Sequence, residues 1–217
     1  MKIDLPASST KSTMQKDKVL LINSCFSKRI RMAETLKIEN SIDLLLVLLY
    51  APGPNGQECE PIEGITRLQK LIFLLNQGKG PQKLVEIAKM YEYKPYKMGP
   101  YTNSLRDDLD TLISIGLVGT ERLKYLITDD ADDDTDICGF DCGDDTKRIE
   151  SQKYYLTKNG KEAGKELYGN LTQKEKEDFA KFKSFFCSLT LRQLLIFVYD
   201  NFPKFTINSE IKGQLGM

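Results

Sequence analysis

Apolar residues recur at helical spacing in two segments near the middle of the chain. In the first, Gly64 to Gln77, apolar positions return every three or four residues, and Gly78 is well placed to end the helix. In the second, Thr102 to Gly116, the same spacing holds, and Thr102 or Asn103 can cap the helix. Its buried stripe is expected to be Leu105, Leu109, Leu112 and Ile113. Both segments are predicted to be amphipathic helices.

Other stretches have the pattern of strands and turns. Tyr91 to Tyr96 alternates aromatic and polar residues, and Pro95 restricts it to an edge or irregular strand. Met98 to Tyr101 is predicted to be a turn that leads into the second helix. After that helix, Thr120 to Thr128 and Ser151 to Thr157 are predicted to pair as a β-hairpin. Two helices followed by a hairpin describe a winged helix-turn-helix.

Further helices are predicted on both sides of this core. They cover residues 39–50, 81–89 and 158–168, followed by two C-terminal helices that begin at the capping boxes Thr172–Glu175 and Thr190–Gln193. The C-terminal pair either packs on the winged helix as an added layer or forms a homodimer contact.

We therefore predict a mainly α-helical fold with a small β-hairpin, in which a winged helix-turn-helix-like core is followed by a C-terminal helical pair. The expected organisation is an N-terminal tail or arm over residues 1–38, a winged-helix-like domain over 39–168, and a helical extension packed on it over 169–217. Residues 1–18 are polar, unlike a signal peptide, and the apolar run 42–50 is too short to span a bilayer. A cytoplasmic protein that does not contact a membrane is expected.

The charge of the chain is zero overall but strongly segregated. Residues 129–145 contain nine aspartates and neither Lys nor Arg. Outside this segment 31 basic residues face 22 acidic ones, so the rest of the chain carries a net charge of +9. The acidic segment lies between the two predicted hairpin strands, where a wing has its tip. It is a solubilising insertion, a surface for a basic partner, or a competitor that folds back on the basic body.

The residue inventory argues against catalysis. The chain has no His, which excludes Ser–His and Cys–His pairs and His metal ligands. Asp132, Asp134 and Asp136 alternate as in a calcium loop, but the Gly and Glu of an EF-hand are not in register. Cys138 and Cys142 do not form a zinc-binding Cys-x-x-Cys pair. We expect no enzyme, no cofactor and no metal.

Four pieces of the chain, together less than half of it, share a recognisable pattern: Leu68-Gln-Lys-Leu-Ile-Phe-Leu, Tyr96-Lys-Met-Gly-Pro-Tyr-Thr, Leu105-Arg-Asp-Asp-Leu-Asp-Thr-Leu with Gly116-Leu-Val, and residues 189–212. In these pieces the chain resembles the YwgA-like and Panacea-domain proteins, which include the SocA-like antitoxins. The family-marking residues are Gly99, Pro100 and Tyr101. The resemblance implies a helical, winged-helix-like fold without catalytic residues, and a role in toxin neutralisation, adaptor work or phage–host conflict.

Two classes of partner remain open. In a DNA-binding winged helix the second helix enters the major groove, but here that helix carries Arg106 against three aspartates, which oppose phosphate contact. The acidic segment instead favours a protein partner with a basic or nucleic-acid-binding face. The aromatic residues between Tyr91 and Tyr101 are either a base-stacking platform or a packed edge.

We therefore predict a non-catalytic binding protein, antitoxin-like or a regulatory adaptor, that acts on a protein partner. The alternative is a DNA-binding transcriptional regulator. The residues predicted to contact the partner or nucleic acid are Arg67, Lys70, Lys97, Tyr101, Asn103, Arg106, Lys153 and Lys158.

Overall fold

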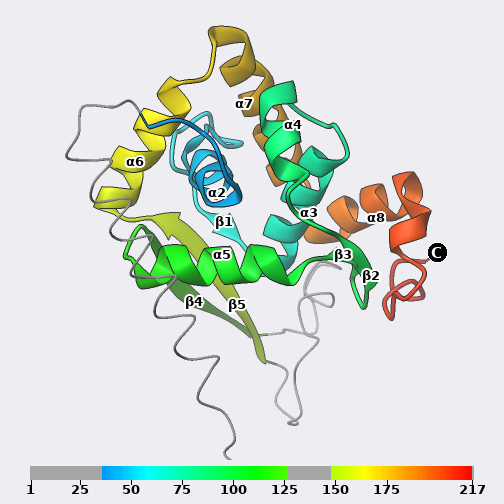
Figure 1. Ribbon diagram of the computed structural model, residues 1–217. Coiled ribbons are helices and arrows are strands. Elements are labelled where there is room, and N and C mark those ends of the chain that lie inside the picture. The colour runs from blue at the N-terminus through cyan, green and yellow to red at the C-terminus, as the bar shows by residue number, and fades with distance from the viewer. Residues whose placement is uncertain (1–35, 127–147, 217) are drawn as a thin grey trace, which may run out of the picture. The chain divides into compact units, whose positions relative to one another are not determined.

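The computed structural model describes residues 36–126 and 148–216. These residues form seven α-helices and two small antiparallel sheets, all within one compact unit that spans Lys37–Met217 (Figure 1). The protein is therefore mainly helical with a small β component, as the sequence predicts. The N-terminal tail up to residue 35 and the acidic segment 129–145 lie outside the described residues.

Helix α2 (Ser41–Tyr50) is the most completely buried element. Asn40 caps it, with its side chain accepting from the Asp43 backbone N–H at 2.9 Å. Every residue from Asp43 to Tyr50 is buried, because α2 packs against α4 (Gln82–Ala88), α5 (Asn103–Ser114), α6 (Lys158–Gly169) and β5 (Arg148–Leu156). In Figure 1 it lies between α6 and α4.

A three-stranded antiparallel sheet supports the helices. The predicted hairpin is confirmed: β4 (Val118–Leu126) pairs with β5 in a register that places Val118 opposite Leu156. Its other neighbour is the two-residue strand β1 (Ile62–Glu63), so the strand order is β1-β5-β4. Helix α5 packs against β4.

Helix α3 (Ile65–Asn76) follows β1 directly and is buried from Leu68 to Leu75. The helix ends at Asn76 with Gln77 as its C-cap, and the φ of 87° at Gly78, the next residue, allows a Schellman motif. In that motif the Gly78 N–H donates to Leu75 O and the Lys79 N–H donates to Leu74 O, both at 2.9 Å. The chain then continues into α4, the short helix expected there.

A second, two-stranded hairpin precedes α5. Strand β2 (Lys94–Tyr96) pairs with β3 (Gly99–Tyr101), and Pro95 lies opposite Pro100. The predicted extended segment is thus confirmed, but the predicted turn at Met98–Tyr101 is wrong. The turn is Lys97–Met98, and Gly99 to Tyr101 form a strand because the positive φ of Gly99, 85°, returns the chain beside β2.

The C-terminal helices are α7 (Gln173–Ser188) and α8 (Leu191–Asn201), and the short 3-10 turn η1 (Pro203–Phe205) follows them. Both predicted capping boxes are present, on Thr172 with Glu175 and on Thr190 with Gln193. Helix α8 packs on α3, and η1 lies against β2. Figure 1 shows α8 and the segment that follows it beside the β2–β3 hairpin.

No single helix in the described part of the chain is long and apolar enough to cross a membrane. Helices α7 and α8 together meet the length and composition criteria, but the pair is bent by 112°.

Candidate functional site

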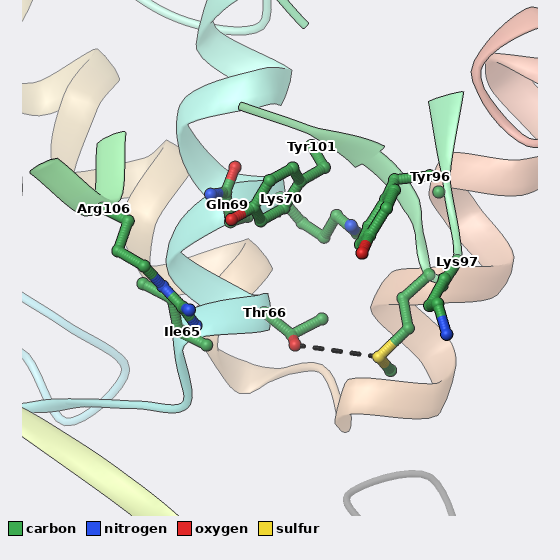
Figure 2. Close-up of a pocket in the computed structure, with 10 residues that line it drawn as sticks. Ile65, Thr66, Gln69, Lys70, Tyr96, Lys97, Tyr101 and Arg106 are labelled. Carbon is green, nitrogen blue, oxygen red and sulfur yellow. Dashed lines mark hydrogen bonds between the residues drawn. The ribbon is translucent and has the colours of Figure 1, made fainter. Parts of the chain in front are cut away.

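Two hollows adjoin at the N-terminal end of α3. The first, which we call the Lys70 pocket, has a volume of about 300 Å³ and is lined by α3, the β2–β3 hairpin and Arg106 of α5 (Figure 2). The second, the hairpin groove, has a volume of about 670 Å³ and lies among α3, α5 and the β4–β5 hairpin. They share the lining residues Ile65, Thr66, Met98 and Arg106. The two hollows therefore form one continuous depression.

Gln69 holds the start of α5 against α3. Its side-chain Nε2 donates to Thr102 O at 2.7 Å, and its Oε1 accepts from the Thr102 N–H at 3.2 Å. Thr102, one of the two residues expected to cap α5, is its N-cap, but its side chain forms no capping hydrogen bond. Since Gln69 is only 2% exposed, the amide satisfies buried backbone groups that water does not reach.

Lys70 forms the inner wall of the Lys70 pocket. The sequence places it on the surface, but its side chain is 2% exposed because the β2–β3 hairpin covers this face of α3. Its Nζ donates to Pro100 O at 2.9 Å. Burial lowers the pKa of Lys70 to about 7, because the charged form is poorly solvated there. Lys70 is thus a buried amine with its pKa near neutrality.

Two tyrosines of the β2–β3 hairpin line the pocket. The rings of Tyr96 and Tyr101 are 5.0 Å apart between centroids and inclined by 33°. Figure 2 shows Arg106 on the opposite side of the pocket from the two tyrosines. Tyr96 is 49% exposed, so one aromatic face of the hairpin remains accessible.

The C-terminal segment fixes the hairpin from the other side. A Cβ on Gly99 would lie 2.9 Å from Tyr199 Cε2, so α8 approaches the turn too closely for a larger residue. The Glu210 N–H donates to Lys97 O at 2.9 Å, and the Glu210 carboxylate pairs with Lys97 Nζ at 3.3 Å. The hairpin is therefore held between α3 and the C-terminus.

The hairpin groove has a mixed lining. Arg106 and Arg122 supply positive charge, Asp110 supplies negative charge, and Leu109 and Ile113 supply apolar surface. Lys70 lines the adjoining Lys70 pocket. When the two hollows are taken together, positively charged lining residues therefore outnumber negatively charged ones.

One of the three α5 aspartates points inward. Asp108 is 7% exposed and accepts from Ser41 Oγ at 2.6 Å and from Tyr91 Oη at 3.0 Å. Burial and the Asp108 carboxylate raise the pKa of Tyr91 well above its ordinary value. On the outward face of α5, Arg106 therefore faces two aspartates rather than three, so the predicted acidity of this surface is too high by one charge.

The structure brings together only half of the predicted contact residues. Lys70, Lys97, Tyr101 and Arg106 line the Lys70 pocket. Arg67 instead donates to Leu189 O at 2.7 Å and to Phe186 O at 3.4 Å, at the end of α7. Asn103, Lys153 and Lys158 line neither hollow. The register sets Lys153 opposite Glu63 and Glu121.

Sequence reasoning missed Gln69, Thr66 and Met98 as lining residues. Met98 Sδ lies 4.0 Å from the Thr66 hydroxyl, at the junction of the two hollows. The signal that points to Gln69 is its position: it is a polar residue inside the segment Leu68 to Leu74, which is otherwise apolar except for Lys70.

Within residues 36–126 and 148–216, no group of three or more Cys, Asp or Glu side chains is placed to hold a metal ion. Cys59 and Cys187 are both free thiols. In Cys187 burial raises the pKa of the thiol, and the same holds for Cys59. A higher pKa leaves less of the reactive thiolate.

Comparison of the chain with protein-family models, with curated proteins and with solved structures finds no match. The function is therefore inferred from the geometry of the two hollows.

Proposed function

We propose that this protein is a non-catalytic binding protein, an antitoxin-like or regulatory adaptor that holds a segment of a protein partner in the hairpin groove. The observation that carries the proposal is the continuous depression itself, about 670 Å³ next to about 300 Å³. Its length along α5 and its mixture of apolar and charged side chains suit an extended or helical peptide segment better than a catalytic centre.

A winged-helix arrangement is part of the proposal. Helices α3 and α5 precede the β4–β5 hairpin, and β1 pairs with the second strand of that hairpin. In this interpretation the partner lies between α5 and the wing. The insertion of α4 and the β2–β3 hairpin between α3 and α5 widens the surface that a partner meets.

The lining predicts the character of the bound segment. Arg106 and Arg122 outnumber Asp110, so a segment that carries an acidic residue beside apolar ones fits the groove. Leu109 and Ile113 offer the apolar contacts. Charged residues at the rim mainly set association rate and specificity, whereas the apolar contacts supply most of the affinity.

The test is an affinity purification from the native host with and without nuclease, using three forms of the chain. The natural chain is compared with an Arg106→Glu/Arg122→Glu variant and with a Lys165→Glu/Lys181→Glu variant, whose changed residues are exposed on α6 and α7. We expect a stoichiometric protein partner that survives nuclease, is lost with the groove variant and is kept by the control. A partner that all three forms retain equally places the binding surface elsewhere and contradicts the proposal.

One observation favours the alternative, a DNA-binding transcriptional regulator. Because Asp108 points inward, α5 exposes less negative charge than its sequence indicates. The same purification tests this alternative. If it recovers DNA without a protein partner, and if nuclease and the Arg106→Glu/Arg122→Glu variant both abolish that recovery, the DNA-binding regulator becomes the better account.

A further inference from the structure

The inner wall of the Lys70 pocket carries hydrogen-bonding capacity that the fold leaves unused. An ammonium group has three N–H donors. Among the described residues, Lys70 Nζ has one acceptor, Pro100 O, and forms no ion pair with a carboxylate. The side chain is 2% exposed, and it lines the Lys70 pocket, so a group bound in the pocket is the partner that it can meet. A buried charge of this kind is stabilised when an anion binds beside it.

The rest of the lining complements a small planar anion. Tyr96 and Tyr101 present neighbouring rings, with centroids 5.0 Å apart, against which another ring can stack. Arg106 adds a second cation from α5. A volume of about 300 Å³ lies at the lower end of the range for small-molecule pockets and matches a ligand with a single ring.

We propose that the Lys70 pocket binds a small aromatic molecule that carries a carboxylate or phosphate group. The oxyanion accepts hydrogen bonds from Lys70 Nζ, and the ring packs beside Tyr96 and Tyr101. Arg106 supplies a second positive charge from the side of the pocket that is shared with the hairpin groove. This ligand site goes beyond the binding of a protein partner and does not depend on it.

Binding is linked to the protonation of Lys70. The other titratable and charged groups that line the pocket are Tyr96 and Lys97 from the β2 side, Tyr101 from β3 and Arg106 from α5. Without a ligand, burial holds the pKa of Lys70 at about 7. A bound oxyanion favours the charged amine and raises this pKa, so the ligand binds with proton uptake and affinity falls as pH rises above 7.

The experiment is titration calorimetry of the full chain with benzoate and phenyl phosphate, against benzyl alcohol as an uncharged ring and cyclohexanecarboxylate as a non-aromatic acid. We expect one of the two aromatic anions to bind with a dissociation constant of about 1 mM or lower, the range accessible to a one-ring ligand. Both comparison compounds should bind at least about tenfold more weakly. Failure of benzoate and phenyl phosphate alike would overturn the proposal.

Substitutions test whether Lys70 and Arg106 bind the aromatic anion. Lys70→Met should weaken it at least about tenfold, Arg106→Gln about twofold to fivefold, and the exposed control Lys165→Met not at all. For benzoate, whose carboxylate stays ionised, affinity of the natural chain should fall at least about tenfold between pH 6 and pH 8.5. That pH dependence should be absent in Lys70→Met, and equal binding by both chains would overturn the proposal.

Two measurements remain decisive if Lys70→Met does not fold. Arg106 is exposed, so Arg106→Gln should keep the fold and still report on the site. Chemical-shift changes on adding benzoate to the natural chain should centre on Gln69, Lys70 and Tyr101; changes centred elsewhere would overturn the proposal. Because the probes are small molecules, their binding is judged separately from the capture of a protein partner.

Discussion

Two buried lysines show how the same side chain is used in different ways. Lys183 of α7 is completely buried, and its Nζ donates to Ala51 O at 2.5 Å, to Leu49 O at 3.2 Å and to Glu60 O at 3.5 Å. Two of these carbonyls lie at the C-terminal end of α2, where the helix dipole favours a cation. Lys70 has one carbonyl. Burial lowers the pKa of Lys70 to about 7. It lowers the pKa of Lys183 only to about 8, because Cys187, Glu60 and Cys59 nearby oppose part of the shift.

Removing the Lys183 amine should destabilise the fold. Lys183→Met leaves carbonyls at the end of α2 buried without a donor, and we expect the free energy of unfolding to fall by about 1 to 3 kcal/mol. Lys181→Met is the matched control, because Lys181 is exposed on the same helix. Urea denaturation of both variants gives the comparison, and equal midpoints would contradict a capping role for Lys183.

The depressed pKa of Lys70 should be visible as a pH dependence of stability. Below pH 7 the amine is charged in both folded and unfolded states, so the full cost of burying the charge is present. Between pH 7 and the unfolded pKa of 10.5 only the unfolded state keeps the proton, and that cost is relieved as pH rises.

The measurement is urea denaturation of the natural chain and of Lys70→Met at pH 6.5 and pH 9.5. The free energy of unfolding of the natural chain, relative to Lys70→Met, should increase by about 3 kcal/mol between these pH values. Taking the difference between the two chains removes the contributions of Lys183 and of the other titrating groups. A difference that stays constant with pH would show that Lys70 is not shifted.

At the scale of elements, glycines set how closely the helices approach. A Cβ on Gly160 would lie 1.9 Å from Leu117 O, and one on Gly164 would lie 2.9 Å from Tyr50 Cβ. These two residues are one helical turn apart on α6, on the side that packs against α2 and the start of β4. Helix α6 can therefore lie against the buried α2 only because this stripe lacks side chains.

Gly160→Ala should consequently be severely destabilising. The clash is with a backbone carbonyl, which cannot rotate away, so we expect a loss of about 3 kcal/mol or more in the free energy of unfolding. Gly169→Ala on the same helix meets nothing within 4 Å and should be neutral or stabilising by up to about 1 kcal/mol. Thermal and urea denaturation test both, and a loss of the same size at Gly169 would contradict the packing argument.

Gly99 combines a positive φ with a close neighbour, and comparison with Gly116 separates the two effects. Gly99→Ala should cost about 2 to 4 kcal/mol, from the φ of 85° and the contact with Tyr199. Gly116→Ala has a φ of 74° and nothing within 4 Å, so about 1 kcal/mol is expected from the backbone alone. In a double-mutant cycle read by urea denaturation, Tyr199→Leu should reduce the cost of Gly99→Ala. Additive effects would show that α8 does not press on the turn.

The helices follow from local signals, whereas the contacts between them do not. The capping boxes at Thr172 and Thr190 are sufficient to place two helix starts, since caps act within one turn of the chain. Helical spacing also predicts which face of α3 is apolar. It does not reveal that the β2–β3 hairpin, about 30 residues later, covers the polar face and buries Gln69 and Lys70.

The candidate site also combines residues that local signals predict with contacts that they do not. Lys97, Tyr101 and Arg106 could be selected from sequence because charged and aromatic residues cluster there, and they do line one pocket. Arg67 has the same charge, but its nearest carbonyls belong to residues about 120 positions away, Phe186 and Leu189. Pairing over that distance is set by tertiary packing, which residue type and spacing do not encode.

At the scale of the whole molecule, the distribution of charge bears on whether the partner is a protein or DNA. The nine aspartates of residues 129–145 cancel a net charge of +9 on the rest of the chain. On α5, exposed Arg106 faces exposed Asp107 and Asp110. A variant that replaces the nine aspartates with asparagine keeps the length of the segment and removes its charge, so it isolates the electrostatic effect.

We expect this asparagine variant to bind duplex DNA more tightly than the natural chain, because nine charges that repel phosphate are gone. The gain should be largely lost between about 50 and 200 mM salt and equal for unrelated sequences, because α5 offers a single outward cation for reading bases. Fluorescence anisotropy with two unrelated duplexes at both salt concentrations measures it. Sequence-selective binding by the natural chain at the higher salt would instead mean that α5 reads DNA despite its aspartates, and it would make the regulator the better account of this fold.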